Sequence, residues 1–198
     1  MAANVFDTII TKGVRAGQVP ARTDDAREWY RNAAKQIKRV NENTLMKTDT
    51  DRLTNKILPG NMYIFQYDAK HKDTLPFWDR VPLIFPFRKV KGGFYGINLH
   101  YLPLNLRAKL MDGLYDYTTN SRYDETTRIN LSYRLLNGVA KLRYFKPCIK
   151  MYLDEHVTTR FMYIYPSEWD IAIFLPIARF EKRTANYVHA ESRNIINA

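Results

Sequence analysis

Residues 81–101 read VPLIFPFRKVKGGFYGINLHY, and this segment predicts a bent β-hairpin. Val81 to Val90 has strand character, but its internal prolines restrict it to an edge position or a bulge. The Lys-Gly-Gly sequence at 91–93 is typical of a hairpin turn. Strand character then resumes from Phe94 to Tyr101, so we expect two antiparallel strands joined by a tight turn.

A further strand is expected just before this hairpin, where side chains alternate in residues 61–67. Short strands with Gly and Pro corners suit a small barrel, so residues 61–102 predict a strongly bent antiparallel meander. Leucines then recur at helical spacing, and we expect a pair of helices within 104–142. Strand character returns at 146–153, 160–165 and 169–175.

This order of elements predicts an α+β fold and not a parallel α/β sheet. The expected core domain is 59–176, a small bent antiparallel β-barrel, for which an SH3-like barrel is one candidate, with the helical pair inserted. Residues 1–58 are expected to form an N-terminal arm, and 177–198 a polar C-terminal tail with one modest helical stretch. We expect the arm to pack mainly on other chains and to add little to the core.

The arm contains one amphipathic helix with a basic face. Thr23 is suited to cap a helix from 24 to about 40, because Asp24 and Asp25 would complement the positive end of the helix dipole. Aromatic and aliphatic residues fall on one face at 3.6-residue spacing. The other face carries a stripe of cations, which we call the basic stripe: Arg27, Arg31, Lys35 and Lys38.

Composition and charge exclude several classes of protein. The chain of 198 residues has 45% hydrophobic residues, which excludes global disorder, and a net charge of +11, which favours acidic partners such as nucleic acid. A single cysteine, Cys148, excludes an internal disulfide and a cysteine zinc site. We expect no membrane span, because no apolar run has the necessary length.

The sequence contains none of the common catalytic, phosphate-binding or metal-binding motifs. It has no nucleophile elbow, no phosphate-binding glycine loop and no histidines at metal-ligand spacing. Asp79 is expected to pair with Arg80 or to cap a turn, and His100 to be structural, sharing a strand face with Asn98. We therefore expect no enzyme activity, no metal, no cofactor and no small-molecule substrate.

Binding features are more prominent than catalytic ones. Besides the basic stripe, a basic-aromatic cluster is formed by Arg88, Lys89, Lys91 and Phe94. Cations interleaved with aromatic rings can hold single-stranded nucleic acid by ion pairing and base stacking. Two alternatives stay open: the rings fill a core while the charges are solvated, or the cations dock on acidic neighbouring subunits. On the first alternative, Phe94 is structural.

Several strings resemble a known family over roughly residues 60–195. The most specific is Asn98-Leu-His-Tyr-Leu-Pro103, within the longer Gly93–Pro103 string. The others are Gly60-Asn-Met-Tyr-Ile-Phe-Gln-Tyr-Asp68, Leu75-Pro-Phe-Trp-Asp79, Pro82-Leu-Ile, Arg107-Ala-Lys-Leu-Met-Asp112, Tyr152-Leu, Trp169-Asp-Ile-Ala-Ile-Phe-Leu-Pro176 and Phe180-Glu-Lys through to Ser192. Together they resemble a family of small virion proteins of T-even-like contractile-tailed phages.

The resemblance implies a structural or assembly role. Its first expectation is a non-catalytic component of the tail or baseplate, made in the host cytoplasm, located in the virion and bound to other virion subunits. Its alternative is a DNA-binding protector of packaged genome ends, which would contact duplex or single-stranded DNA. No catalytic residue follows from it.

Overall fold

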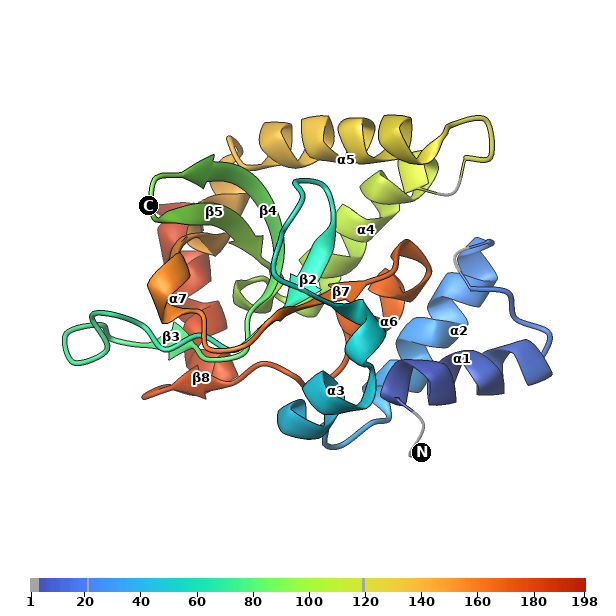
Figure 1. Cartoon of the computed structure of the whole chain (residues 1–198), viewed down its shortest axis with the longest axis horizontal. Coiled ribbons are helices and arrows are strands. Elements are labelled where there is room, and N and C mark those ends of the chain that lie inside the picture. The colour runs from blue at the N-terminus through green and yellow to red at the C-terminus, as the bar shows by residue number, and fades with distance from the viewer. Residues whose placement is uncertain (1–3, 21, 119) are drawn as a thin grey trace.

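A six-stranded antiparallel sheet forms the centre of the protein in the computed structural model, which describes residues 4–20, 22–118 and 120–198 (Figure 1). Its strand order is β1-β7-β2-β4-β5-β6. The strands are β1 (Leu53–Thr54), β2 (Met62–Ile64), β4 (Leu83–Val90), β5 (Gly93–Asn98), β6 (Ile149–Leu153) and β7 (Phe161–Ile164). A separate ribbon pairs β3 (Trp78–Asp79) with β8 (Phe180–Glu181).

The predicted hairpin is confirmed as β4 and β5. Val90 pairs with Gly93 across the turn, and the register shifts between Pro86 and Arg88, as expected for a strand with an internal proline. Gly92 adopts a positive φ of 74°. At Gly93 a Cβ atom would lie 2.2 Å from the carbonyl oxygen of Tyr152, so only glycine allows β6 to approach this closely.

The expected barrel is not formed. Among the described strands, β1 and β6 each have one neighbour, so the sheet is open at both edges. A closed barrel would require the two edge strands to pair with each other. Instead, β1 comes from the N-terminal segment and extends the sheet beyond β7, while β6 lies at the opposite edge. Turns of 310 helix follow β5 and precede β6. What the sequence places correctly is the mixed α and β content and the antiparallel pairing.

One expected strand is a helix. Residues 169–175 were predicted as β-like, but α6 (Trp169–Ala172) forms there. All four residues of α6 are buried. A short segment with no exposed face cannot be distinguished from a buried strand by its hydrophobic pattern.

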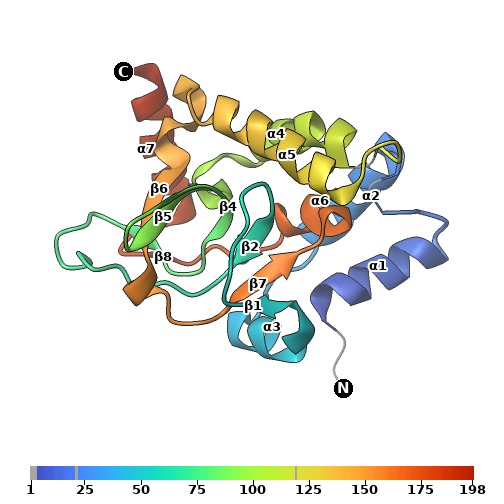
Figure 2. The same cartoon turned by 45° about the horizontal axis from the view of Figure 1, so that its top comes forward.

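Helices surround the sheet. Figures 1 and 2 place α4 and α5 along one side, α1 and α2 at one end, and α7 near β5 at the other end. The predicted helical pair is confirmed as α4 and α5. The bounds are α1 (Val5–Arg15), α2 (Asp24–Lys35), α3 (Glu42–Thr48), α4 (Leu104–Thr118), α5 (Glu125–Val139) and α7 (Ala185–Asn197). In the part of the chain that the structure describes, no helix has both the length and the apolar character that crossing a membrane requires.

The N-terminal segment packs on the rest of the chain, so the expectation that it adds little to the core is wrong. Phe6, Tyr30 and Leu45 belong to the same buried cluster as the inner face of the sheet. The predicted basic helix forms as α2, and the Thr23 side chain accepts a hydrogen bond from the backbone of Ala26. The helix ends at Lys35 and not near residue 40, so Lys38 lies beyond it. The buried face of α2 provides the physical reason: apolar side chains at helical spacing find their partners within this chain. The division into arm, core domain and tail stays a prediction.

Candidate nucleic-acid interface

Two long stretches of the chain carry cations but no carboxylate. Residues 80–111 and 126–153 each contain six Lys or Arg residues and no Asp or Glu. The first stretch supplies β4 and β5, and the second supplies most of α5 and all of β6. Because β5 is hydrogen-bonded to both β4 and β6, and α5 contacts β4, the fold joins the two stretches into one basic region (Figure 1).

One exposed part of this region is the hairpin cluster, which we define as Arg88, Lys89 and Lys91. All three side chains are exposed, and none forms an ion pair with a described carboxylate. The Arg88 guanidinium lies 4.4 Å from the ring centroid of Tyr95. Unpaired surface cations of this kind are free to neutralise phosphates.

A groove of about 450 Å³ adjoins the hairpin cluster. Lys56, Lys89 and Arg160 line it together with one carboxylate, Asp154. The groove thus brings cations from three separate segments to the same place, which extends the hairpin cluster across the surface.

Phe94 is separated from the cations with which the sequence grouped it. Its ring is only 2% exposed and stacks on Tyr152, with 5.5 Å between ring centroids. It also contacts Phe65 and Phe161 in a buried aromatic cluster. Phe94 is therefore buried, as the alternative in which the rings fill a core expects, and the ring beside Arg88 is that of Tyr95.

The basic stripe is divided by the fold. Arg27 is only 3% exposed, and its guanidinium donates to Asp170 Oδ2 at 2.8 Å and to Asp112 Oδ1 at 2.9 Å. Arg31 binds the same two carboxylates at 2.7 Å each. These two arginines therefore fasten α2 to α4 and α6, and their charges are already compensated inside the chain.

The other half of the stripe stays on the surface. Lys35 is exposed, and its ammonium lies 4.7 Å from the ring centroid of Phe174. Lys38 is exposed and lines a polar groove that also contains Arg39 and Arg80. Lys35 and Lys38 therefore remain available to a partner, whereas the two arginines are not.

A buried polar network lies beneath the basic region. Asp79 Oδ2 accepts hydrogen bonds from His100 Nδ1 at 2.7 Å and from Asn98 Nδ2 at 3.0 Å. Its Oδ1 accepts from the backbone N–H groups of Val81 and Arg179. Of the two roles expected for Asp79, the pair with Arg80 is wrong, because Arg80 binds Glu42 and Glu181 instead. The other role, capping a turn, is confirmed by the hydrogen bond from the Val81 N–H.

The ionisation of this network is set by burial and hydrogen bonding. Burial alone would raise the pKa of Asp79, but His100, Asn98 and the Arg179 N–H lower it below its ordinary value. Burial lowers the pKa of His100 more than Asp79 raises it, so the ring is neutral at pH 7. Because Asp79 and His100 are both almost fully buried, the pair is structural, as expected for His100.

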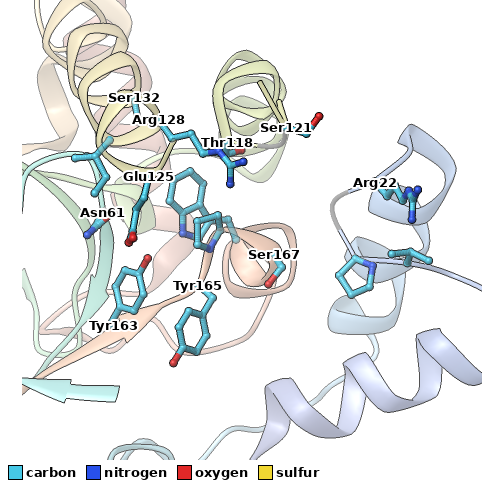
Figure 3. Close-up of a pocket in the computed structure, with 16 residues that line it drawn as sticks. Arg22, Asn61, Thr118, Ser121, Glu125, Arg128, Ser132, Tyr163, Tyr165 and Ser167 are labelled. Carbon is cyan, nitrogen blue, oxygen red and sulfur yellow. The ribbon is translucent and has the colours of Figure 1, made fainter. Parts of the chain in front are cut away.

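A second groove, of about 820 Å³, is lined by residues outside the hairpin. Figure 3 shows Glu125 pointing from α5 toward Tyr163 and Arg128 pointing toward Thr118, with Arg22 on the far side of the groove. Arg128 Nε is buried and has no hydrogen-bond partner in the described chain. Glu125 is the one acidic side chain of the described lining, which holds no His or Cys.

The described residues contain no cluster of side chains suited to bind a metal ion. No group of three or more His, Cys, Asp or Glu side chains with suitable geometry occurs within residues 4–20, 22–118 and 120–198.

Comparison with known families gives one match. The family model described as "Phage T4 terminal DNA protecting protein" matches residues 3–194. The match includes nearly all of the N-terminal segment, so the limit of the resemblance at residue 60 was wrong. No curated protein and no solved structure matches the chain.

Proposed function

This chain belongs to the family of phage T4 terminal DNA protecting proteins, and from that premise we propose that it is a non-catalytic protein that binds and covers the ends of linear phage DNA. The family match carries the proposal. It favours the end-protector alternative over the tail or baseplate component that was the first expectation. The proposed location is the virion, at the ends of the packaged genome, after synthesis in the host cytoplasm.

The hairpin cluster supports DNA as the partner. Arg88, Lys89 and Lys91 are exposed and have no carboxylate partner among the described residues, and neutralising phosphates would release the counterions condensed on the duplex. Phosphate contacts of this kind fix the position of a protein on DNA without reading its sequence. That property suits a protein that must bind an end of any sequence.

Bulk charge alone does not distinguish an end from the middle of a duplex. An end differs in two respects: the last base pair has an uncovered stacking face, and the strand terminates there. A protector must therefore combine phosphate contacts with a group that reaches the terminal base pair, and a bound protein then blocks an exonuclease, which needs the free end.

The test compares two DNA molecules of equal length and sequence. One is a hairpin duplex with a single open end, and the other is a dumbbell closed by loops at both ends. We expect the open-ended molecule to bind more than tenfold tighter, a difference of over ~1.4 kcal/mol that charge cannot produce. Equal affinities for the two molecules would refute end binding.

A second measurement tests protection itself. The open-ended hairpin is incubated with an exonuclease, with and without saturating protein, and intact DNA is counted over time. We expect the protein to slow digestion of the open end and to leave an endonuclease cut at the centre of the duplex unaffected. Equal slowing of both reactions would indicate general coating of DNA.

A further inference from the structure

An aromatic cavity lies at the β6 edge of the sheet, distinct from the hairpin cluster. Its volume is about 390 Å³, at the small end of the ~300–1,000 Å³ that ligand pockets occupy. It is enclosed by β6, by β3 and by the loop between β2 and β3, which projects from the body on the left of Figure 1. Its principal lining residues are Tyr67, Phe77, Trp78, Tyr101, Lys150 and Tyr152.

The rings are held in place by contacts behind the cavity. Tyr67 and Tyr152 pack edge to face with 5.0 Å between ring centroids, and the Tyr67 hydroxyl accepts a hydrogen bond from the backbone of Leu153. Phe77 lies 6.1 Å from Tyr101, at an interplanar angle of 33°. Rings fixed in this way lose little freedom when a planar ligand stacks on them.

Two donor groups of the lining lack a polar partner in the described chain. Lys150 forms no ion pair, and its ammonium lies 4.0 Å from the ring centroid of Tyr101. The indole N–H of Trp78 is buried and meets no acceptor. Burial also lowers the pKa of Lys150, and the one carboxylate of the described lining, Asp79, is held by His100 and Asn98. Buried donors without partners usually have a specific explanation, and an absent ligand is one.

These features fit a nucleobase joined to a phosphate. The aromatic walls match the π face of a base, which stacks with little regard to sequence. An acceptor on the base edge would satisfy the free N–H donor of Trp78, and Lys150 offers positive charge for the phosphate. Lys70 also lines the cavity, but its ammonium already lies 3.9 Å from Glu155 Oε1. In a duplex only the terminal nucleotide can leave the stack at small cost, because it has a single stacked neighbour.

We propose that this cavity receives the unstacked terminal nucleotide of a DNA end, with the base among Phe77, Trp78 and Tyr101 and its phosphate beside Lys150. The proposal rests on the proposed function and specifies it: the hairpin cluster supplies general affinity, and the aromatic cavity supplies recognition of the end.

The first experiment uses wild-type protein and a photo-reactive base. Hairpin duplexes with one open end carry 5-iodouracil, either as a one-nucleotide extension at that end or at an internal paired position. After irradiation, the crosslinked peptides are identified by mass spectrometry. We expect the terminal probe to crosslink to residues 67–78 or to 150–152, and the internal probe not to do so. Terminal crosslinks that map elsewhere would overturn the proposal.

The second experiment uses two conservative variants and one matched control. Trp78→Phe keeps an aromatic ring but removes the N–H, and Lys150→Met keeps the aliphatic stem but removes the charge. The control is Lys146→Met, which removes an exposed and unpaired cation outside the cavity. A thermal melt of each variant verifies folding before binding is measured.

Affinity is measured for the blunt end, for the extended end and for the dumbbell. We expect wild type to favour the extended end over the blunt end, and the two cavity variants together to reduce that advantage at least tenfold, while Lys146→Met preserves it. An advantage that survives both variants would overturn the cavity proposal alone, whereas equal binding of open and closed DNA would overturn the proposed function. The last measurement is the affinity for a free deoxynucleoside monophosphate. If the protein binds this nucleotide tightly but shows no preference for DNA ends, the cavity proposal is also overturned.

Discussion

Removing the hairpin cluster provides the most quantitative test of how this protein holds DNA. The triple variant Arg88→Gln, Lys89→Gln and Lys91→Gln lowers the net charge of +11 by three while preserving the length and polarity of exposed side chains. None of the three forms an ion pair within the described chain, so we expect folding to be unaffected. A structural role would appear instead as a lowered melting temperature.

The magnitude follows from counterion release. If each of the three cations neutralises one phosphate, their loss makes the slope of log affinity against log salt shallower by about 2.7. The advantage of wild type over the variant should then shrink by about 40-fold when salt rises from about 50 to about 200 mM. This change is far larger than the error of a binding titration.

The assay is a fluorescence titration of the open-ended hairpin DNA at several salt concentrations. A matched control is Lys12→Gln, Arg15→Gln and Lys47→Gln, which removes three exposed cations from α1 and α3, on helices away from the hairpin. We expect the control to retain nearly the wild-type slope. Equal slope changes in the two triple variants would refute a localised interface and indicate a diffuse charge effect.

Three other predictions concern stability. Asp170→Ala leaves the buried Arg27 without its principal partner, and we expect a loss of about 3–5 kcal/mol, measured by urea denaturation. Deleting residues 1–58 should abolish the cooperative melt of the remainder, because those residues fill part of the main core, and a truncated chain with an intact melt would contradict this packing. Burial lowers the folded pKa of both His100 and His189, so stability should fall as pH drops below ~6.5, and His189→Gln should reduce this dependence in denaturation curves recorded from pH 7 to pH 5.

The elements predicted from the sequence were those with local signals. The hairpin at 91–93, the cap at Thr23 and the helical pair all follow from turn chemistry, capping and periodicity, which act within a few residues. The open sheet was not predictable in this way. Its order depends on which distant strands pair, and β1, only two residues long, gives almost no pattern of its own.

In the candidate site too, features with a local sequence signal could be predicted, whereas those that depend on distant residues could not. The sequence groups three cations that the structure exposes, Arg88 and Lys89 at the end of β4 and Lys91 in the turn. It cannot show that Arg27 is neutralised by Asp112 and Asp170, which lie 85 and 143 residues further along the chain. The aromatic cavity was missed for a related reason. Its walls come from three segments, and the only local signal, an excess of aromatic residues, is equally typical of a core.

The long-range ion pair between Arg27 and Asp170 also limits how early the N-terminal helices can fold, because it cannot form before Asp170 is synthesised. Synthesis proceeds at about 5–20 residues per second, so the 143 residues between them take roughly 7–29 s to emerge. During that interval α2 has neither its carboxylates nor the α6 surface on which it packs. Native contacts between distant segments are slow to form and leave apolar surface exposed meanwhile. The N-terminal helices, although made first, are therefore among the last parts of the molecule to reach their final place.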